Sequence, residues 1–279
     1  MVSTGIRFSQ VVLIISLVLT VFIVLQVLWV VFDVRLPPEV PTNVSRVVIT
    51  DEVVYLTLPR KVTNISVEEV ILLRRSIREY TSDPVKLEDL AMILWAAYGV
   101  TDPRWGGFRT SPSAGATYPL EVYVVVGENG VLVRDGEYLK PGVYKYDVHR
   151  HLLTPVKSGD VRRELAVAAL NQKWVEDAPV NLVICAVFER TTARYGERGR
   201  VRYVPMEVGH LGQNVYLMIT ALGYGGVVVG AFYDDRVQAI ISAKPDEIPM
   251  YKIPIGVPKE PPRTTFEDVW RYIEGRRSS

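Results

Sequence analysis

The sequence predicts an α+β fold preceded by one membrane-spanning helix. Three observations lead to this prediction: an uncharged apolar run near the N-terminus, helical periodicity in several later segments, and strand-like runs between them at irregular intervals. A regular alternation of strands and helices would instead indicate a doubly wound parallel sheet. The chain has 279 residues, enough for one sizeable hydrophobic core.

Composition argues against two classes of protein. The formal net charge is +1, which gives no electrostatic support for nucleic acid as a partner. The single cysteine, Cys185, excludes an internal disulfide framework and a cysteine-rich metal site. It lies in an apolar, strand-like run, where a free thiol is expected to be a small buried side chain.

The N-terminal run has the length and polarity of a membrane anchor. No charged residue occurs from Phe8 to Phe32, and residues 11–32 exceed the roughly 20 residues that a spanning helix needs. A signal peptide would require small residues at a cleavage site, and a buried core helix would show a polar stripe. We therefore expect a tail at 1–10, an anchor at 11–32, a proline-spaced linker at 33–54 and a folded domain at 55–279. The side of the membrane is not predicted, because basic residues flank the run on both sides.

Two helices are predicted at the start of the domain. Ser66 and Glu69 have the spacing of a capping box ahead of an apolar run, so a helix is expected to begin there. A second helix follows the Asp83-Pro84 turn and is expected to stop at Gly99. Its apolar face consists of Leu87, Leu90, Ala91, Leu94, Ala97 and Tyr98.

Strands and helices then follow in irregular order. The expected strands are residues 120–126, a hairpin at 142–156, and residues 180–188, 223–232 and 250–258, with a possible edge strand at 46–58. The expected helices are residues 160–170, about 205–222, a short helix at 234–243 capped by Asp234 or Asp235, and a C-terminal helix from Thr265. A loop with five arginines is expected before the long helix: Arg190, Arg194, Arg198, Arg200 and Arg202.

Two histidines are candidate metal ligands. His149 and His151 are two residues apart in the expected hairpin, so they should share one face of a strand. No cysteine or carboxylate ligand is expected beside them, so an exposed hairpin is favoured over a metal site. The sequence also has no phosphate-binding G-x-x-x-x-G-K-[ST] loop and no H-E-x-x-H motif.

Two short stretches indicate a binding site. The stretch LLRRSIREY places three guanidinium groups and a hydroxyl within five residues at the end of a helix, a combination that suits phosphate. The alternative is a solvated basic turn paired with Glu79 or Asp83. The stretch SPSAGA at 111–116 precedes the apolar strand at 120–126, and such small residues allow a ligand to approach the backbone closely.

Four motifs in order give the chain a family resemblance. RRSIREY, SPSAGATYPLEVYVVV, GHLGQNVYLMITALGYGGVVVGAF and MYKIPIGVP resemble the nitroreductase superfamily, and more closely its SagB-type dehydrogenase branch, which includes azoline oxidases of peptide-toxin maturation. The resemblance spans roughly residues 55–263. It implies an α+β fold with a central, mostly antiparallel sheet flanked by helices, and FMN bound at a homodimer interface.

The resemblance also implies roles for individual residues. Arg74, Arg75 and Ser76 would hold the phosphate and ribityl chain of FMN, and Arg78 would reach the polar edge of the isoalloxazine. The residues expected to line the ring, mostly through backbone atoms, are Pro112, Ser113, Ala114 and Gly115, with Val229, Gly230 and Ala231 near the hydride-carrying N5 atom. Arg263 would be a further phosphate ligand, and no role is assigned to Gln213, Asn214 or His210.

One position departs from the family pattern. Azoline oxidases have a Lys-Tyr pair before the G-H-x-x-Q-N helix, used as a catalytic base and its partner, whereas this chain has Arg194 and Tyr195. Arginine does not readily release its proton, so base catalysis at that position is doubtful. Tyr195 is the remaining catalytic candidate, as an acid or an orienting group.

The function expected from these observations is a membrane-anchored FMN oxidoreductase. It would pass hydride through flavin N5 from a donor such as NAD(P)H to an unidentified small-molecule or peptide acceptor. Two alternatives stay open: an azoline dehydrogenase acting on peptide heterocycles, and a non-catalytic flavin-binding sensor or docking module. A tethered globular domain without a cofactor is the least specific interpretation.

Overall fold

The computed structural model describes residue 20, residues 48–50 and residues 52–277. Residues 1–43 and 44–279 form two separate compact units, and the second is described below. In the described part of the chain, none of the helices has the length and apolar character needed to cross a membrane. Apart from residue 20, the predicted anchor at 11–32 lies outside the described residues, as does most of the predicted linker.

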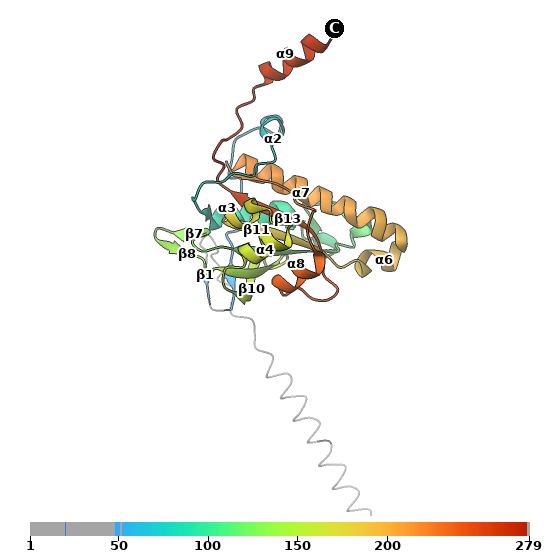
Figure 1. Ribbon diagram of the computed structural model, residues 1–279. Helices are drawn as coiled ribbons and strands as arrows, with labels where there is room; N and C mark the ends of the chain where they lie inside the picture. Colours follow the sequence, from blue (N-terminus) through green and yellow to red (C-terminus); the bar gives the residue numbers. More distant parts are fainter. Residues whose placement is uncertain (1–19, 21–47, 51, 278–279) are drawn as a thin grey trace, which may run out of the picture. The chain divides into compact units, whose positions relative to one another are not determined.

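An antiparallel sheet of eight strands forms the centre of the second unit (Figure 1). Its order is β1 (Val48–Ile49), β2 (Val54–Tyr55), β10 (Leu152–Ser158), β9 (Gly142–Asp147), β6 (Leu120–Val126), β11 (Val180–Ala186), β13 (Ile248–Gly256) and β12 (Gly225–Gly226). Every pairing within it is antiparallel. All residues of β11 are buried, as its uninterrupted apolar sequence requires. The α+β prediction with an antiparallel central sheet is therefore confirmed.

Among the described residues, two small sheets and eight α-helices accompany the central sheet. The small sheets consist of β3 (Val85–Lys86), β7 (Val131–Arg134) and β8 (Glu137–Tyr138), and of β4 (Val100–Asp102) and β5 (Phe108–Arg109). The helices are α2 (Val67–Leu73), α3 (Leu87–Tyr98), α4 (Arg162–Ala168), α5 (Lys173–Asp177), α6 (Glu189–Tyr195), α7 (Val204–Ala221), α8 (Asp234–Ile240) and α9 (Phe266–Arg277). Short 3-10 segments occur at Arg104–Gly106 and Ala114–Ala116.

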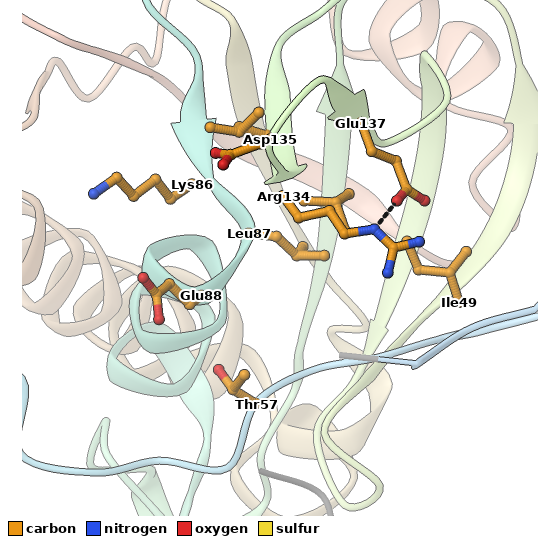
Figure 2. Close-up of a pocket in the computed structure, with 10 residues that line it drawn as sticks. Ile49, Thr57, Lys86, Leu87, Glu88, Arg134, Asp135 and Glu137 are labelled. Atoms are coloured by element: carbon orange, nitrogen blue, oxygen red, sulfur yellow. Dashed lines mark hydrogen bonds and ion pairs between the residues drawn. The ribbon is translucent and has the colours of Figure 1, made fainter. Parts of the chain in front are cut away.

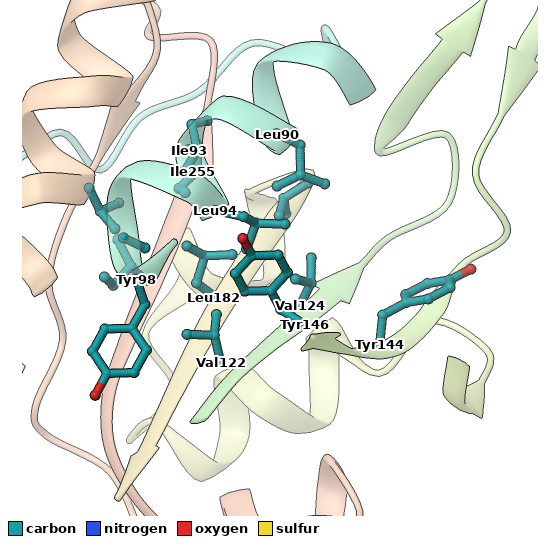
Figure 3. Packing of buried hydrophobic residues seen from close by; sticks show 14 of the residues in the cluster. Leu90, Ile93, Leu94, Tyr98, Val122, Val124, Tyr144, Tyr146, Leu182 and Ile255 are labelled. Carbon is teal, nitrogen blue, oxygen red and sulfur yellow. The ribbon is translucent and has the colours of Figure 1, made fainter. Parts of the chain in front are cut away.

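The sheet buries both faces because successive side chains of its central strands point in opposite directions. Val122 and Val124 of β6 pack with α3 and α7 in one core, whereas Tyr123 and Val125 pack with α4 and α8 in another. Figure 3 shows the first core, where Leu90 and other residues of α3 lie against the sheet. Helix α9 contributes no buried residue to either core.

Local sequence signals correctly predicted several element ends. The capping box at α2 is present: Ser66 N–H donates to Glu69 Oε2 at 2.8 Å, and Glu69 N–H donates to Ser66 Oγ at 3.2 Å. Helix α3 ends at Tyr98 with Gly99 as its cap, as predicted. The single edge strand predicted at 46–58 is instead two short antiparallel strands, β1 and β2, at the edge of the central sheet.

The prediction that His149 and His151 share a strand face is wrong. Both lie in the turn between β9 and β10, where the Asp147 carboxylate accepts from the backbone N–H of His149 at 3.0 Å. His151 is buried, donates from Nε2 to the Thr57 carbonyl at 2.9 Å and accepts at Nδ1 from Tyr146. In this turn the His151 ring is therefore buried and the His149 ring is exposed.

Three further predictions need correction. The expected arginine loop is mostly helical, with α6 followed by a π-helical turn at Gly199–Tyr203. Tyr233, not Asp234 or Asp235, is the N-cap residue of α8, and both aspartates lie in its first turn. The glycine-rich stretch 223–232 is not a continuous strand: it forms β12 and one isolated bridge between Val229 and Lys252.

The glycines of β12 are required by close packing. A Cβ at Gly226 would lie 2.7 Å from the Pro254 carbonyl oxygen and 2.9 Å from Ile219 Cδ1. A Cβ at Gly225 would lie 2.9 Å from the side chain of Ile77. These two glycines therefore allow the segment after α2 to lie directly against the edge of the sheet.

Replacing Gly226 with alanine should destabilise the protein by about 1–3 kcal/mol, because the new methyl group meets a backbone carbonyl that cannot rotate away. The matched control is Gly209→Ala, at an exposed position of α7 with no heavy atom within 4 Å of the added Cβ. That change should stabilise by up to about 1 kcal/mol through helix propensity. Urea unfolding of the two variants measures both effects, and equal midpoints would contradict the packing argument.

Candidate active site

The three arginines and the serine at the end of α2 form what we call the arginine–serine turn (residues 74–78). Arg74 is the C-cap residue of α2, and its guanidinium carbon lies 5.1 Å from the centre of the Tyr216 ring. Ser76 Oγ is 2.9 Å from the Tyr216 hydroxyl. Arg75 donates from Nη2 to Thr264 Oγ1 at 3.1 Å, which brings the segment containing Arg263 to the same place. The turn therefore joins two of the predicted phosphate-binding segments.

The glycine-rich segment (residues 225–231) lies beside this turn. Ser76 forms a parallel bridge with Gly226, and the N–H of Ile77 donates to the Gly226 carbonyl at 2.9 Å. The Tyr216 hydroxyl accepts from the N–H of Val228 at 2.9 Å, so its own proton is available to Ser76. Tyr216 of α7 thus holds both segments.

Trp174 of α5 and Gln172, its N-cap residue, contact Arg78 and the end of the glycine-rich segment. The guanidinium carbon of Arg78 lies 5.4 Å from the centre of the Trp174 ring. Gln172 donates from Nε2 to the Ala231 carbonyl at 3.0 Å. Gly230 is exposed, and a Cβ added there would have only Tyr251 within 4 Å, at 3.9 Å. We call residues 74–78, 225–231 and 263 the first half-site.

The charges of the first half-site are not compensated. Among the described residues, none of the four arginines 74, 75, 78 and 263 forms an ion pair with a carboxylate, and Asp83 accepts instead from Thr81. The alternative of a basic turn paired with Glu79 or Asp83 is therefore not what the structure contains. Trp174 Nε1 is buried without a hydrogen-bond partner beside Arg78. A bound anion or polar ligand would satisfy this arrangement.

The small-residue loop (residues 112–115) belongs to a second group of residues. Gly115 has φ of 61°, and a Cβ there would lie 2.5 Å from the Tyr195 hydroxyl and 2.8 Å from Arg194 Nη1. Ser113 Oγ accepts from the N–H of Tyr118 at 2.9 Å. Pro112 and Gly115 are exposed, as a surface that receives a ligand requires. The loop and the Arg194-Tyr195 pair, which the sequence only suggested separately, are thus adjacent.

Asn214 anchors the entrance of this loop. Its Nδ2 donates to the Thr110 carbonyl at 3.2 Å and to Ser111 Oγ at 3.1 Å, and Ser111 donates to the Ala97 carbonyl at 2.9 Å. These contacts give Asn214 a structural role. His210 and Gln213 are exposed on α7.

Glu207 is a site residue that the sequence reasoning missed. It is only 2% exposed, and its Oε1 accepts from the Tyr98 hydroxyl at 2.5 Å. Burial raises the pKa of the Glu207 carboxyl, while hydrogen bonds from Ser113 and Tyr98 and the charge of Arg109 act in the opposite direction. Its position three residues after Val204 and four before Leu211, on the apolar stripe of α7, was the signal that could have identified it. We call residues 112–115, Arg194, Tyr195 and Glu207 the second half-site.

The two half-sites lie on opposite faces of α7. Asn214 donates to Ser111 Oγ, directly before the small-residue loop, whereas Tyr216 contacts Ser76 of the first half-site. Two residues are about 200° apart around an α-helix, so these two contacts lie on nearly opposite sides of α7. The structure therefore brings Arg74, Ser76 and Gly230 into one group and Ser113 into another.

One surface groove lies near both half-sites, and a second cavity lies away from them. A groove of about 420 Å³ lies between α2, α3 and α7, and its lining includes Val70 near the first half-site and Thr110 near the second. Most of its lining is apolar: Ile65, Val67, Val70, Trp95, Ala96, Leu217, Met218 and Ala221. Figure 2 shows a different cavity of about 630 Å³, where Arg134 pairs with Glu137 near Lys86 and Glu88. No predicted site residue lines that cavity.

Lys252 is a second buried charge that sequence reasoning missed. Its backbone pairs with that of Val229, with N···O distances of 2.8 and 2.9 Å. Its side chain is fully buried, donates to the Leu165 carbonyl at 3.3 Å and lies 4.7 Å from the centre of the Phe232 ring. Burial lowers the pKa of Lys252 to about 7. The signal for it was a lysine within an otherwise apolar central strand.

Comparisons with known proteins agree with this architecture. The sequence profile of the Nitroreductase family matches residues 71–257, which include every predicted site residue except Arg263. A protein of Methanocaldococcus jannaschii that carries a nitroreductase name is 51% identical over 195 residues, covering 70% of this chain and 92% of that protein. The solved structure of a protein from Ralstonia eutropha, also named as a nitroreductase, has a TM-score of 0.63 and 27% identity, covering 81% of this chain and 100% of that chain.

A more distant relative lies in a toxin operon. TfxC, a protein of the trifolitoxin operon of Rhizobium leguminosarum, is 24% identical over 196 residues, covering 66% of this chain and 53% of TfxC. The resemblance drawn from the four motifs is thereby confirmed.

Lys252 should make stability depend on pH in a specific direction. Its pKa is lower in the folded protein than in the unfolded chain, so between about pH 7 and pH 10 the unfolded chain holds a proton that the folded protein has released. The contribution of Lys252 to the free energy of unfolding should therefore rise with pH in this window, by at most about 1.4 kcal/mol per pH unit. Urea unfolding of the wild type and of Lys252→Met between pH 6 and about 10 tests this. Identical pH dependence in both proteins would contradict it.

Proposed function

The chain belongs to the nitroreductase family, and we propose that it is a membrane-anchored, homodimeric oxidoreductase that uses FMN. The family assignment makes it an oxidoreductase, and members of the family typically depend on a flavin. The observation that supports FMN in this chain is the first half-site, where uncompensated arginines and the Ser76 hydroxyl lie beside an open glycine-rich segment.

The residues of the first half-site suit each part of the cofactor. Arg74, Arg75, Ser76 and Arg263 would hold the phosphate and the ribityl chain, because guanidinium groups bind phosphate through paired N–H donors. Arg78 would contact the polar edge of the ring system. The backbone at Gly230 is open, because a Cβ there would meet only Tyr251 within 4 Å, and a larger side chain at this position would exclude a planar group.

The chemistry follows from the cofactor and its surroundings. Bound FMN would supply hydride transfer between a donor such as NAD(P)H and a second substrate. The cation of Arg78 would polarise the ring edge, and the loop 112–115 would exclude water from one face. Arg194 remains charged and therefore orients rather than exchanges a proton. Tyr195, held against Gly115, is the catalytic candidate at that face.

A second copy of the chain would complete the site. The half-sites lie on opposite faces of α7, so one planar ring can touch both only if each copy supplies one of them. A two-fold dimer would form two such sites. The apolar groove between α2, α3 and α7 extends from one half-site toward the other and is the surface on which we place the second copy.

Attachment to a membrane rests on the sequence. Residues 11–32 are long and apolar enough to span a bilayer, and the linker at 33–54 would keep the domain away from its surface. The side of the membrane, and with it access to nicotinamides, is a question for the intact protein.

Azoline oxidation is the second candidate, favoured by the distant similarity to TfxC. In that activity the flavin would accept hydride from a peptide thiazoline or oxazoline. The arginine at position 194 argues against it, because this activity uses a lysine base at that position. A nicotinamide that fails to reduce the flavin, together with a heterocyclic peptide that succeeds, would reverse this preference.

Substitutions in the arginine–serine turn should weaken FMN binding. Arg74→Ala and Ser76→Ala should each weaken binding roughly tenfold or more, because each removes a hydrogen bond to a charged phosphate. Arg163→Ala, at an exposed arginine of α4, removes the same charge elsewhere and should bind as the wild type does. Titration of flavin fluorescence measures all four proteins. If the wild-type protein is purified without flavin and does not bind added FMN, the proposal is wrong.

Mixed dimers test whether each site uses both copies. Chains with Arg74→Ala and Ser76→Ala lack the first half-site, and chains with Ala114→Trp have a blocked second half-site. Neither homodimer should bind FMN, but a mixed dimer purified through two different tags should bind one FMN per dimer, in the site built from the two intact halves. Absence of flavin from stable mixed dimers would show that both halves come from one copy.

A further inference from the structure

Lys252 lies directly beside the part of the glycine-rich segment that is proposed to face the cofactor ring. Its backbone N–H donates to the Val229 carbonyl at 2.9 Å, and its carbonyl accepts from the Val229 N–H at 2.8 Å. Its ammonium group lies 4.7 Å from the centre of the Phe232 ring. Residues 229–232 therefore pair with the backbone of Lys252 and also place an aromatic ring over its charged end. The amine is thus enclosed next to the first half-site.

The immediate surroundings of this amine supply no negative charge. The side chain is 0% exposed, and Nζ donates to the Leu165 carbonyl of α4 at 3.3 Å. Among the described residues, no carboxylate forms an ion pair with Lys252. Glu247, on the same strand, pairs instead with Lys145. The amine is therefore buried without a compensating charge.

The other titratable groups on this side of the sheet do not respond in its place. Tyr123 and Cys185 belong to the same core as Leu165, and burial raises the pKa of both, so both keep their protons. The charged side chains of the two helices that cover this side, α4 and α8, are exposed, except that Arg162 is partly buried and pairs with Asp160. The exposed ones are Arg163, Glu164, Asp234, Asp235 and Arg236.

This environment allows Lys252 to change its charge. A buried amine without a carboxylate partner tends to lose its proton, because its charged form is poorly solvated. Burial accordingly lowers the pKa of Lys252 to about 7. The arginines of the first half-site keep their charge at any working pH. Lys252 can therefore respond to a new charge that appears nearby, whereas those arginines cannot.

Reduction of a flavin by hydride creates such a charge. Hydride brings two electrons and one proton, so the ring system gains one negative charge. In the protein interior, a unit charge about 10 Å away changes a protonation ratio roughly tenfold or more. A neutral amine beside residues 229–231 would therefore bind a proton more tightly once the cofactor is reduced.

We propose that Lys252 takes up a proton from solvent when FMN bound at the first half-site is reduced, and releases it when the cofactor is reoxidised. This inference rests on the proposed function. Hydride from the donor supplies the two electrons and the proton held at flavin N5, and the solvent proton forms the third N–H bond of the Lys252 ammonium. When hydride passes to the acceptor, that N–H bond breaks and the proton returns to solvent. Lys252 thereby offsets the charge of the reduced cofactor and favours reduction.

The pH dependence of the redox equilibrium tests this in the full-length, FMN-loaded protein. Reduction by xanthine and xanthine oxidase in the presence of a reference dye measures the equilibrium at each pH between about 7.5 and 9. The wild type should take up two protons for two electrons, so the equilibrium constant should fall about 100-fold per pH unit, or about 59 mV. Lys252→Met should take up one proton, which gives about tenfold per pH unit, or about 30 mV. Lys244→Met removes an exposed lysine and should behave as the wild type does.

Nuclear magnetic resonance of the wild type follows the amine itself and does not depend on a variant that folds. In protein labelled with carbon-13 at the lysine Cε atoms, one resonance should titrate at a pKa of about 7 in the oxidised protein. Ordinary lysines titrate near a pKa of about 10.4, so this resonance is distinct. After reduction of the cofactor, its pKa should be higher by about one pH unit or more.

The outcomes separate this inference from the proposed function. Equal pH dependence of the redox equilibrium in the wild type and Lys252→Met would overturn the inference but leave FMN binding intact. An amine whose pKa is the same in both redox states would do so as well. A protein that binds no FMN would overturn the proposed function, and the inference with it.

Discussion

The arrangement of this protein depends on one helix that holds two binding segments on opposite faces. Near the middle of α7, Asn214 fixes the start of the loop that contains Ser113, and two residues later Tyr216, on the opposite face, fixes the turn that contains Ser76. The helix itself is held in place by its apolar stripe, which packs in the same core as α3 and the central sheet. Rigid packing of α7 therefore fixes both segments and also prevents them from meeting within one copy of the chain.

Close approach of backbones is the second requirement of the first half-site. The arginine–serine turn reaches the sheet edge only because Gly225 and Gly226 have no side chains. The family resemblance assigns only residues 229–231 of the glycine-rich segment to a ligand, and Gly225 and Gly226 serve packing within the protein. Gly230 is different, because a Cβ there would meet mostly open space. The lack of a side chain at this position therefore suits the proposed binding of a ring.

Local signals predicted the elements well, whereas tertiary position decided the rest. Ser66 and Gly99 marked helix ends because capping is satisfied by residues three to five positions away. His149 and His151 were misplaced because a carboxylate at Asp147 nucleates a turn that interrupts the apparent alternation. Glu207 and Lys252 were missed because each is a single charge in an apolar pattern, and only the fold reveals which partners compensate it. The family motifs predicted the segments of the candidate site, but their division between two faces of α7 could not be predicted from their order.

The division of the site between the two faces of α7 has a consequence for how proteins of this architecture diverge. The residues proposed to hold the phosphorylated tail of the cofactor and those proposed to border its reacting face are supported by separate contacts on one scaffold. Under that proposal, substitutions around positions 112–118 can accumulate under selection for new substrates while the cofactor-binding residues are inherited intact. Modularity of this kind allows one ancestral scaffold to give rise to many specificities.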